Sequence, residues 1–126
     1  DFSYQNCLRL DDVFVCAYDF DDSNIHHLSD LTKYRTLLLE ESSHSRKVLD
    51  NNLLKYNVKL KPKFELASYS LVTEFIRSGL GIGLITKEFI SKELEDGSLF
   101  EINLNPSITN RHIGMICLNN KIYLRL

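Results

Sequence analysis

The stretch "RSGLGIGLITKEF", residues 77–89, places three glycines at alternate positions directly after a segment with helical periodicity. That segment, residues 68–79, predicts an amphipathic helix, and Gly79 stands where a helix commonly ends in a left-handed residue. A dinucleotide-binding fingerprint requires the opposite order, a strand, then glycines, then a helix. The glycines therefore predict a helix stop and a close-packed strand over 81–85. The apolar face of the helix is expected to comprise Leu71, Val72, Phe75 and Ile76.

Strands and helices alternate on both sides of this stretch. The apolar run 36–40 leads into a helix that Ser42 and Ser43 open, and a strand over 63–67 leads into the helix already described. After the glycines, Thr86 is expected to cap a third helix. Three such units imply parallel strands with right-handed crossovers. We therefore expect an α/β fold, a mixed and mainly parallel sheet with helices on both faces. Further strands are expected over 13–18, 99–104 and 112–118.

Composition excludes several classes of protein. The 126 residues are 44% hydrophobic with a net charge of -2, which fits one domain over 1–126 and lacks the basic stripe of a nucleic-acid-binding surface. No membrane span or signal peptide is visible. Cys7, Cys16 and Cys117 have no zinc-site or disulfide-framework spacing, so reduced cytoplasmic thiols are expected. The absence of an initial methionine and the apolar ending predict a piece of a longer protein.

Hydroxyl groups cluster where the parallel strands are expected to end. Ligands of open α/β sheets bind at this edge, and helix amino termini there offer free amides to anions. The residues concerned could act as helix caps or as the rim of a ligand site, and both roles can coexist. Glu40 and Glu41 would repel an anion here unless they point away. The candidate binding residues are Ser42, Ser43, Ser45, Ser68 and Thr86.

The chain shows no catalytic or metal-binding constellation. His44 lies between two serines, but a nucleophile and its base seldom meet at adjacent positions, so His44 is interpreted as a surface residue. His26 and His27 are neighbours that point apart, without a carboxylate or cysteine to complete a ligand set. We predict no catalytic residue, no metal and no cofactor.

The segment from "LLLEESSHSRKVLD" to "LEDGSLFEINL" resembles the second lobe of the effector-binding domain of LysR-type transcriptional regulators. The matching elements are the Ser-rich turn with its "SR..LD" helix, "P.FELAS...V..FI.SGLGIGLI" and "L.DGSL..I.L". The resemblance covers about residues 8–122. It implies a lobe of a type 2 periplasmic-binding-protein-like fold, with effector positions at 42–45 and Ser68. Thr86 departs from the pattern, since many members have proline there.

The resemblance also implies a function. It predicts that the chain, as a second regulatory lobe with crossover segments, senses a small-molecule effector in the cytoplasm. DNA would be bound only through a separate amino-terminal winged helix-turn-helix. Homo-oligomer contacts would fall on the helix 45–56 and the strand 63–67. The alternatives are a lobe of a transport-type solute-binding protein and an enzyme fragment, the latter requiring a catalytic constellation.

Overall fold

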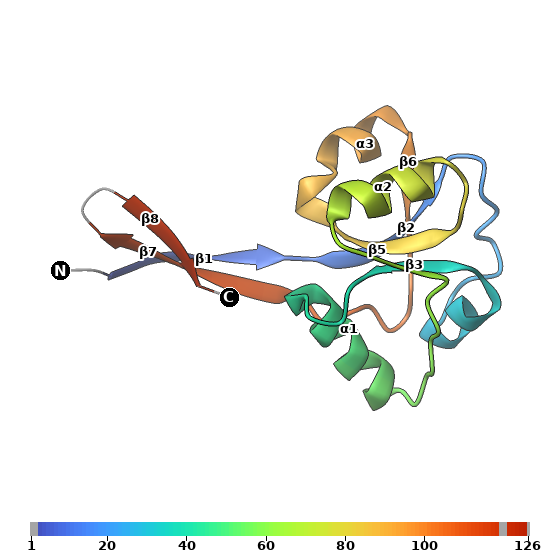
Figure 1. Cartoon of the computed structure of the whole chain (residues 1–126), viewed down its shortest axis with the longest axis horizontal. Helices are drawn as coiled ribbons and strands as arrows, with labels where there is room; N and C mark the ends of the chain where they lie inside the picture. The colour runs from blue at the N-terminus through green and yellow to red at the C-terminus, as the bar shows by residue number, and fades with distance from the viewer. Residues whose placement is uncertain (1–2, 119–120, 126) are drawn as a thin grey trace.

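The structure, a computed structural model, describes residues 3–118 and 121–125, and side chains for residues 9–112. Helices and strands alternate through the middle of the chain, and strands occupy both ends (Figure 1). The elements are β1 Ser3–Leu10, β2 Asp12–Ala17, η1 Leu28–Lys33, β3 Thr36–Leu39, α1 His44–Lys55, β4 Phe64–Leu66, α2 Tyr69–Arg77, β5 Ile82–Thr86, η2 Lys87–Phe89, α3 Ser91–Asp96, β6 Leu99–Ile102, β7 Arg111–Leu118 and β8 Lys121–Arg125.

The central sheet has five strands in the order β4-β3-β5-β2-β6. Strand β3 pairs in parallel with β4 and β5, as the strand–helix alternation predicts. Strand β2 pairs antiparallel with both β5 and β6, so it alone runs against the other strands. The predicted mixed, mainly parallel sheet is confirmed. The carboxyl ends of β3 and β5 and the start of β2 consequently share one edge of the sheet.

Helices cover both faces of this sheet, as predicted (Figure 1). On one face Leu49 and Leu53 of α1 pack with Phe14 of β2, and all three side chains are buried. On the other face Val72 and Ile76 of α2 form a second buried cluster. Alternate residues of each strand point to opposite faces, so one sheet supplies both cores.

The glycines end a helix and allow close strand packing, as the sequence predicts. Gly79 has φ of 78°, and the amides of Gly79 and Leu80 donate to the carbonyls of Ile76 and Phe75, the Schellman arrangement that ends α2. A Cβ at Gly83 would lie 2.8 Å from the Leu37 carbonyl oxygen. The glycine strand therefore packs more closely than a side chain would allow.

Strands β1 and β7 extend away from the α/β body and form a separate sheet with β8 (Figure 1). Asp11 alone separates β1 from β2, and Leu10 pairs with Arg111 at the point where both strands leave the body. Neither β1 nor β8 was predicted from the sequence. Among the described residues, no helix is long and apolar enough to cross a membrane.

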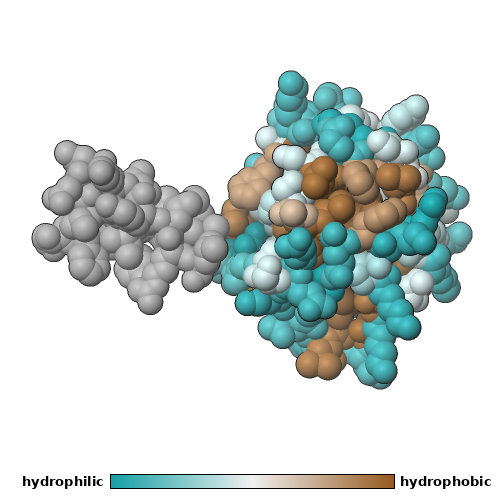
Figure 2. Space-filling model, in the orientation of Figure 1, coloured by the Kyte–Doolittle hydropathy of each residue, from teal (hydrophilic) through white to brown (hydrophobic). Residues whose placement is uncertain are grey.

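Two local predictions need correction. The helix expected from Thr86 is instead a short 3-10 turn, η2, followed by the six-residue α3, and the Thr86 side chain makes no capping hydrogen bond. Leu71 was expected on the apolar face of α2 but is 44% exposed, because the buried face is narrower than the periodicity suggests. Figure 2 shows apolar surface over α2, in keeping with this exposure.

Candidate effector-binding site

A buried ion pair lies where β2, β5 and β7 meet. The Arg111 guanidinium donates to both carboxylate oxygens of Asp12, with Nε–Oδ2 and Nη2–Oδ1 distances of 2.6 and 3.1 Å. The exposed fractions of Arg111 and Asp12 are 7% and 2%. A charge pair removed from water to this extent is stable only with good geometry and further hydrogen bonds.

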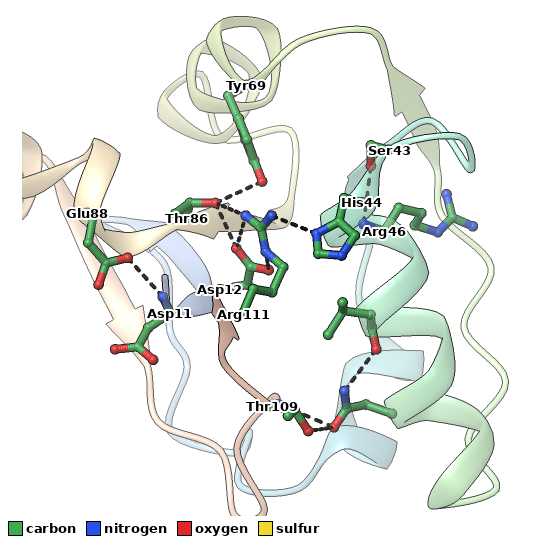
Figure 3. A network of polar contacts seen from close by, with 12 residues as sticks. Asp11, Asp12, Ser43, His44, Arg46, Tyr69, Thr86, Glu88, Thr109 and Arg111 are labelled. Atoms are coloured by element: carbon green, nitrogen blue, oxygen red, sulfur yellow. Dashed lines mark hydrogen bonds and ion pairs between the residues drawn. The ribbon is translucent and has the colours of Figure 1, made fainter. Parts of the chain in front are cut away.

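The Thr86 hydroxyl, which is fully buried, completes the hydrogen bonding of this pair (Figure 3). Its oxygen lies 2.7 Å from Asp12 Oδ1, 3.0 Å from Arg111 Nη2 and 2.8 Å from the Tyr69 hydroxyl. A hydroxyl donates once and accepts twice, so Thr86 donates to Asp12 and accepts from Arg111 and Tyr69. Thr86 is therefore a structural link between Asp12, Arg111 and Tyr69, rather than a helix cap.

His44 extends the network to α1. Arg111 Nη1 lies 3.1 Å from His44 Nδ1, and because a guanidinium can only donate, Nδ1 is the acceptor. His44, predicted as a surface residue, is half-buried and therefore less exposed than expected. Arg111 thus joins the start of β7 to the first residue of α1, as well as to β2 and β5 (Figure 3).

The amino terminus of α1 is held firmly beside the end of β3. Ser43 is the N-cap, and its hydroxyl accepts from the Arg46 amide at 3.1 Å. The buried Arg46 side chain donates to the Leu39 carbonyl at 2.9 Å and to Glu65 at 2.6 Å, and it also pairs with Asp50. This explains the "SR..LD" pattern, because Arg46 joins the helix to β3 and β4, and Asp50 pairs with the Arg46 guanidinium from the next turn of α1.

Two further hydrogen bonds tie α1 to the segment that precedes β7. The buried Asn52 side chain accepts from the amide and the hydroxyl of Thr109 at 3.3 and 2.9 Å. Thr109 and Arg111, two positions apart in the sequence, are thus both hydrogen-bonded to α1, through Asn52 and His44. The position of β7 therefore depends on the position of α1.

A hollow of about 250 Å³ opens between α1, α2 and the start of β7. The amino terminus of α1 is at one end of it, and the remaining wall is largely apolar. The first backbone amides of a helix have no partner within the helix, so those of His44 and Ser45 are available to a ligand. The lining residues are Leu10, Leu39, Ser43, His44, Ser45, Tyr69, Phe89 and Arg111.

The structure places the predicted binding residues in different surroundings. Ser43 and the buried Ser45 line the hollow. Thr86 is joined to it through Arg111 and Tyr69. Ser68 is exposed and caps α2 by accepting from the Leu71 amide, and Ser42 is exposed in the preceding turn. Glu40 and Glu41 are exposed and do not line the hollow, so their charges would repel an anionic ligand there less than the sequence suggested.

Sequence reasoning missed Asp12, Tyr69 and Arg111 as site residues. Asp12 and Arg111 are 99 residues apart, and each stands at the edge of an apolar strand where a charged residue is ordinary. Asp12 directly precedes the predicted strand 13–18, but only the antiparallel direction of β2 brings it opposite Thr86, and nothing in the sequence signalled that direction.

A second hollow of about 260 Å³ lies beside β2 and β6, lined in part by Arg9, Asp11, Lys87 and Glu101. Its charged groups already pair with one another: Arg9 lies 3.3 Å from Asp11, and Lys87 lies 2.9 Å from Glu101. The hydrogen bond to Glu101 raises the pKa of Lys87. These groups are satisfied without a ligand.

Metal and redox sites find no support among the residues that the structure describes. No three His, Cys, Asp or Glu side chains there gather as a metal site. His27 accepts from the Ser29 amide and caps η1, whereas His26 is exposed. Burial, with a smaller contribution from Asp22, raises the pKa of Cys16 to about 11, so this thiol stays protonated at neutral pH. The side chains of Cys7 and Cys117 lie outside the described set.

The structure is thus an α/β body with a hollow at the sheet edge where ligands of open α/β sheets bind. Residues 1–122 match the family described as LysR substrate binding domain, and the chain belongs to that family. It is the effector-binding domain family of LysR-type transcriptional regulators, which is not an enzyme family. These matches favour the regulator over a lobe of a transport-type solute-binding protein.

Similar proteins are longer than this chain. The probable RuBisCO transcriptional regulator of Chlorokybus atmophyticus is 27% identical over 86% of this chain and 36% of its own length. The protein of the same name from Gracilaria tenuistipitata var. liui is 30% identical over 73% and 31%, respectively. The chain thus spans about a third of these relatives.

Solved structures share the fold. The Synechocystis PCC6803 CcmR regulatory domain, in complex with 2-PG, has a TM-score of 0.78 at 20% identity, over 96% of this chain and 59% of that one. The effector binding domain of QuiR, in complex with shikimate, has a TM-score of 0.74 at 19% identity, over 96% and 57%. The expected periplasmic-binding-protein-like fold is confirmed.

Proposed function

We propose that this chain is the second regulatory lobe, with its crossover strands, of a LysR-type transcriptional regulator, and that it binds the effector in the hollow at the amino terminus of α1. One observation carries the proposal. Ser43 and Ser45, chosen from the sequence, line a hollow that also contains the buried Arg111. A concave site with a few convergent polar groups is the usual form of a small-molecule site.

The residues have different proposed roles. Ser43, Ser45 and the first amides of α1 would contact the effector directly. Thr86 would act indirectly, because its hydroxyl holds Arg111. Ser42 and Ser68 stay candidates at the rim, where they would meet the effector only if a second lobe closed over it. No residue is proposed to be catalytic.

The attachment of β7 to this site supports a sensing role. Arg111 is the first residue of β7, and Asp12, the first residue of β2, is separated from β1 by Asp11 alone. An effector that contacts Arg111 therefore touches the point where both strands leave the body. Such a ligand shifts the protein between conformations only as far as its affinity for them differs.

The remaining parts of the function belong to the longer protein. We propose that DNA is bound by a winged helix-turn-helix outside this chain, that the regulator works in the cytoplasm, and that it forms homo-oligomers. Strand β4 is at the edge of the sheet, and among the described strands it pairs with β3 alone. Leu54 of α1 and Phe64 of β4 are 80% and 37% exposed. These features support subunit contacts on the helix 45–56 and the strand 63–67.

A thermal-shift screen of metabolites on the full-length protein tests the proposal, because a ligand of the native state raises the melting temperature. The best ligand is then titrated by calorimetry into Ser45→Ala and, as a matched control, Ser70→Ala, which is exposed and absent from the lining of the hollow. We expect weaker binding only in Ser45→Ala. Equal affinity in both variants would remove the proposed site.

A further inference from the structure

The hydrogen bond between His44 and Arg111 joins α1 to the start of β7 (Figure 3). His44 Nδ1 lies 3.1 Å from Arg111 Nη1. A guanidinium stays protonated and only donates, so the imidazole must accept through a nitrogen that carries no proton. A neutral histidine has one such nitrogen, and a protonated histidine has none. This contact therefore exists only while His44 is neutral.

Protonation of His44 would also place two positive charges side by side. Arg111 faces the imidazole at 3.1 Å, and only 7% of Arg111 is exposed, so water and salt screen the repulsion poorly. His44 is moreover the first residue of α1, where the helix dipole disfavours a cation. Both effects oppose an imidazolium while α1 and β7 stay in contact.

No carboxylate forms an ion pair with His44 among the side chains that the structure describes. The buried Asp12 of β2 already accepts two bonds from Arg111. An imidazolium at this position would therefore lack the partner that a partly buried charge requires. The side chains that reach this site from β5, α2 and η2 carry no charge near neutral pH: Thr86, Tyr69 and Phe89.

The other charged side chains of α1, of the turn before it and of η2 are paired elsewhere or exposed. Arg46 donates to Glu65, and Lys87 pairs with Glu101. Within the described side chains, Arg111 is thus the charged group that His44 contacts. The exposed ones that could meet a protonated His44 only from solvent are Glu40, Glu41, Lys47 and Glu88.

We infer that His44 is a proton-sensitive contact: in its neutral form it holds the start of β7 against α1, and in its protonated form it releases β7. Strand β7 leaves the α/β body beside β1 (Figure 1), so its release changes how the body is joined to the strands that extend from it. A proton thus acts as a signal in its own right. This device requires no effector and goes beyond the proposed function.

Hydrogen–deuterium exchange of the full-length protein at about pH 7.5 and about pH 5.5 tests the inference. The reporter is the peptide over 107–112, because the Thr109 amide donates to Asn52 of α1 and loses this bond when β7 is released. Each rate is divided by the intrinsic exchange rate at that pH. A free imidazole takes up a proton at about pH 6.5, so at about pH 5.5 the released form is favoured roughly tenfold. The corrected rate of the reporter peptide should rise by the same factor of roughly ten.

Two variants separate His44 from its neighbours. His44→Gln keeps a side-chain oxygen that can accept from Arg111 and removes the titrating group, so its corrected rate should differ less than about twofold between the two pH values. The matched control is His112→Gln, at an exposed histidine of the same strand, and it should retain the roughly tenfold rise. In the wild type, the peptide over α2, residues 69–77, is the internal control and should show no rise.

The inference fails if His44→Gln retains the rise of the wild type, or if His112→Gln loses it. An equal rise in the reporter and the α2 peptide of the wild type would show general loosening rather than release of β7, and would also overturn it. That comparison needs no variant, so it decides the matter even if His44→Gln does not fold. A wild-type reporter whose corrected rate is the same at both pH values would likewise overturn the inference.

Discussion

Replacing Thr86 by valine removes one hydroxyl from the centre of the buried network while nearly conserving volume. That hydroxyl contacts Asp12, Arg111 and Tyr69 at 2.7, 3.0 and 2.8 Å. Thr86→Val thus leaves the backbone of β5 intact and removes only the hydrogen bonds.

The expected change in the free energy of unfolding follows from the hydrogen bonds that each partner of Thr86 loses. Asp12 keeps its two bonds from Arg111, and the Tyr69 hydroxyl can turn to water in the hollow. Arg111 keeps its bonds to Asp12 and His44 but leaves one Nη2 hydrogen buried without an acceptor. Losing this hydrogen bond to a charged group costs about 1.5–3 kcal/mol. The added methyl group recovers about 0.8 kcal/mol. The difference is a net loss of about 0.7–2.2 kcal/mol.

Urea unfolding followed by circular dichroism measures this loss, with Thr73→Val as the matched control. The Thr73 hydroxyl makes a single bond to the Tyr69 carbonyl of its own helix, and removing it should change stability by less than about 0.5 kcal/mol. If Thr86→Val were as mild as Thr73→Val, the Asp12–Arg111 pair would not depend on the hydroxyl, and the network described above would be refuted.

Three further predictions concern single residues. Gly83→Ala should destabilise the protein by about 2 kcal/mol in the same assay, since its Cβ would meet the Leu37 carbonyl at 2.8 Å; a neutral effect would contradict close packing there. Ser43→Ala and Ser68→Ala should each cost about 1 kcal/mol through a lost cap, but in calorimetry Ser43→Ala should weaken effector binding more than Ser68→Ala, because Ser43 lines the hollow and Ser68 lies at its rim; equal weakening would contradict this placement. The raised pKa of Cys16, about 11 against 9.0 for a free thiol, stabilises the native state while the thiol is protonated, so this contribution should be lost as pH rises from 9.0 to about 11. Peptide mapping after iodoacetamide treatment at neutral pH should find Cys16 unmodified until urea unfolds the protein; rapid native labelling would contradict its burial.

The helix ends, the helix caps and the order of helix and strand could be predicted, because each depends on residues that are neighbours in the sequence. The helix before Gly79 and the strand after it have the predicted order, because a left-handed glycine and apolar spacing are properties of neighbouring residues. The caps Ser43 and Ser68 were predicted for the same reason. The turn at Thr86 was mistaken, since the hydroxyl has stronger partners in Asp12 and Arg111 than in a helix amide.

Only some of the residues that line the hollow could be predicted from the sequence. Serines at strand ends mark one side of the hollow, whereas Arg111 reaches it from the last third of the chain through antiparallel pairing with β1. That pairing brings Leu10 opposite Arg111, and no local pattern in either segment specifies the register. The partial burial of His44 could not be predicted, because its partner Arg111 lies 67 residues away in the sequence.

The proposed effector site lies at the amino terminus of α1, in contact with the first residue of β7. The most direct test is a crystal structure of the full-length protein bound to the metabolite that raises its melting temperature most. We expect the metabolite to lie in the hollow, with a hydrogen-bond acceptor within reach of Arg111 Nη1 and the Ser45 amide. A metabolite bound elsewhere, with this hollow empty, would show that the effector site is not at α1.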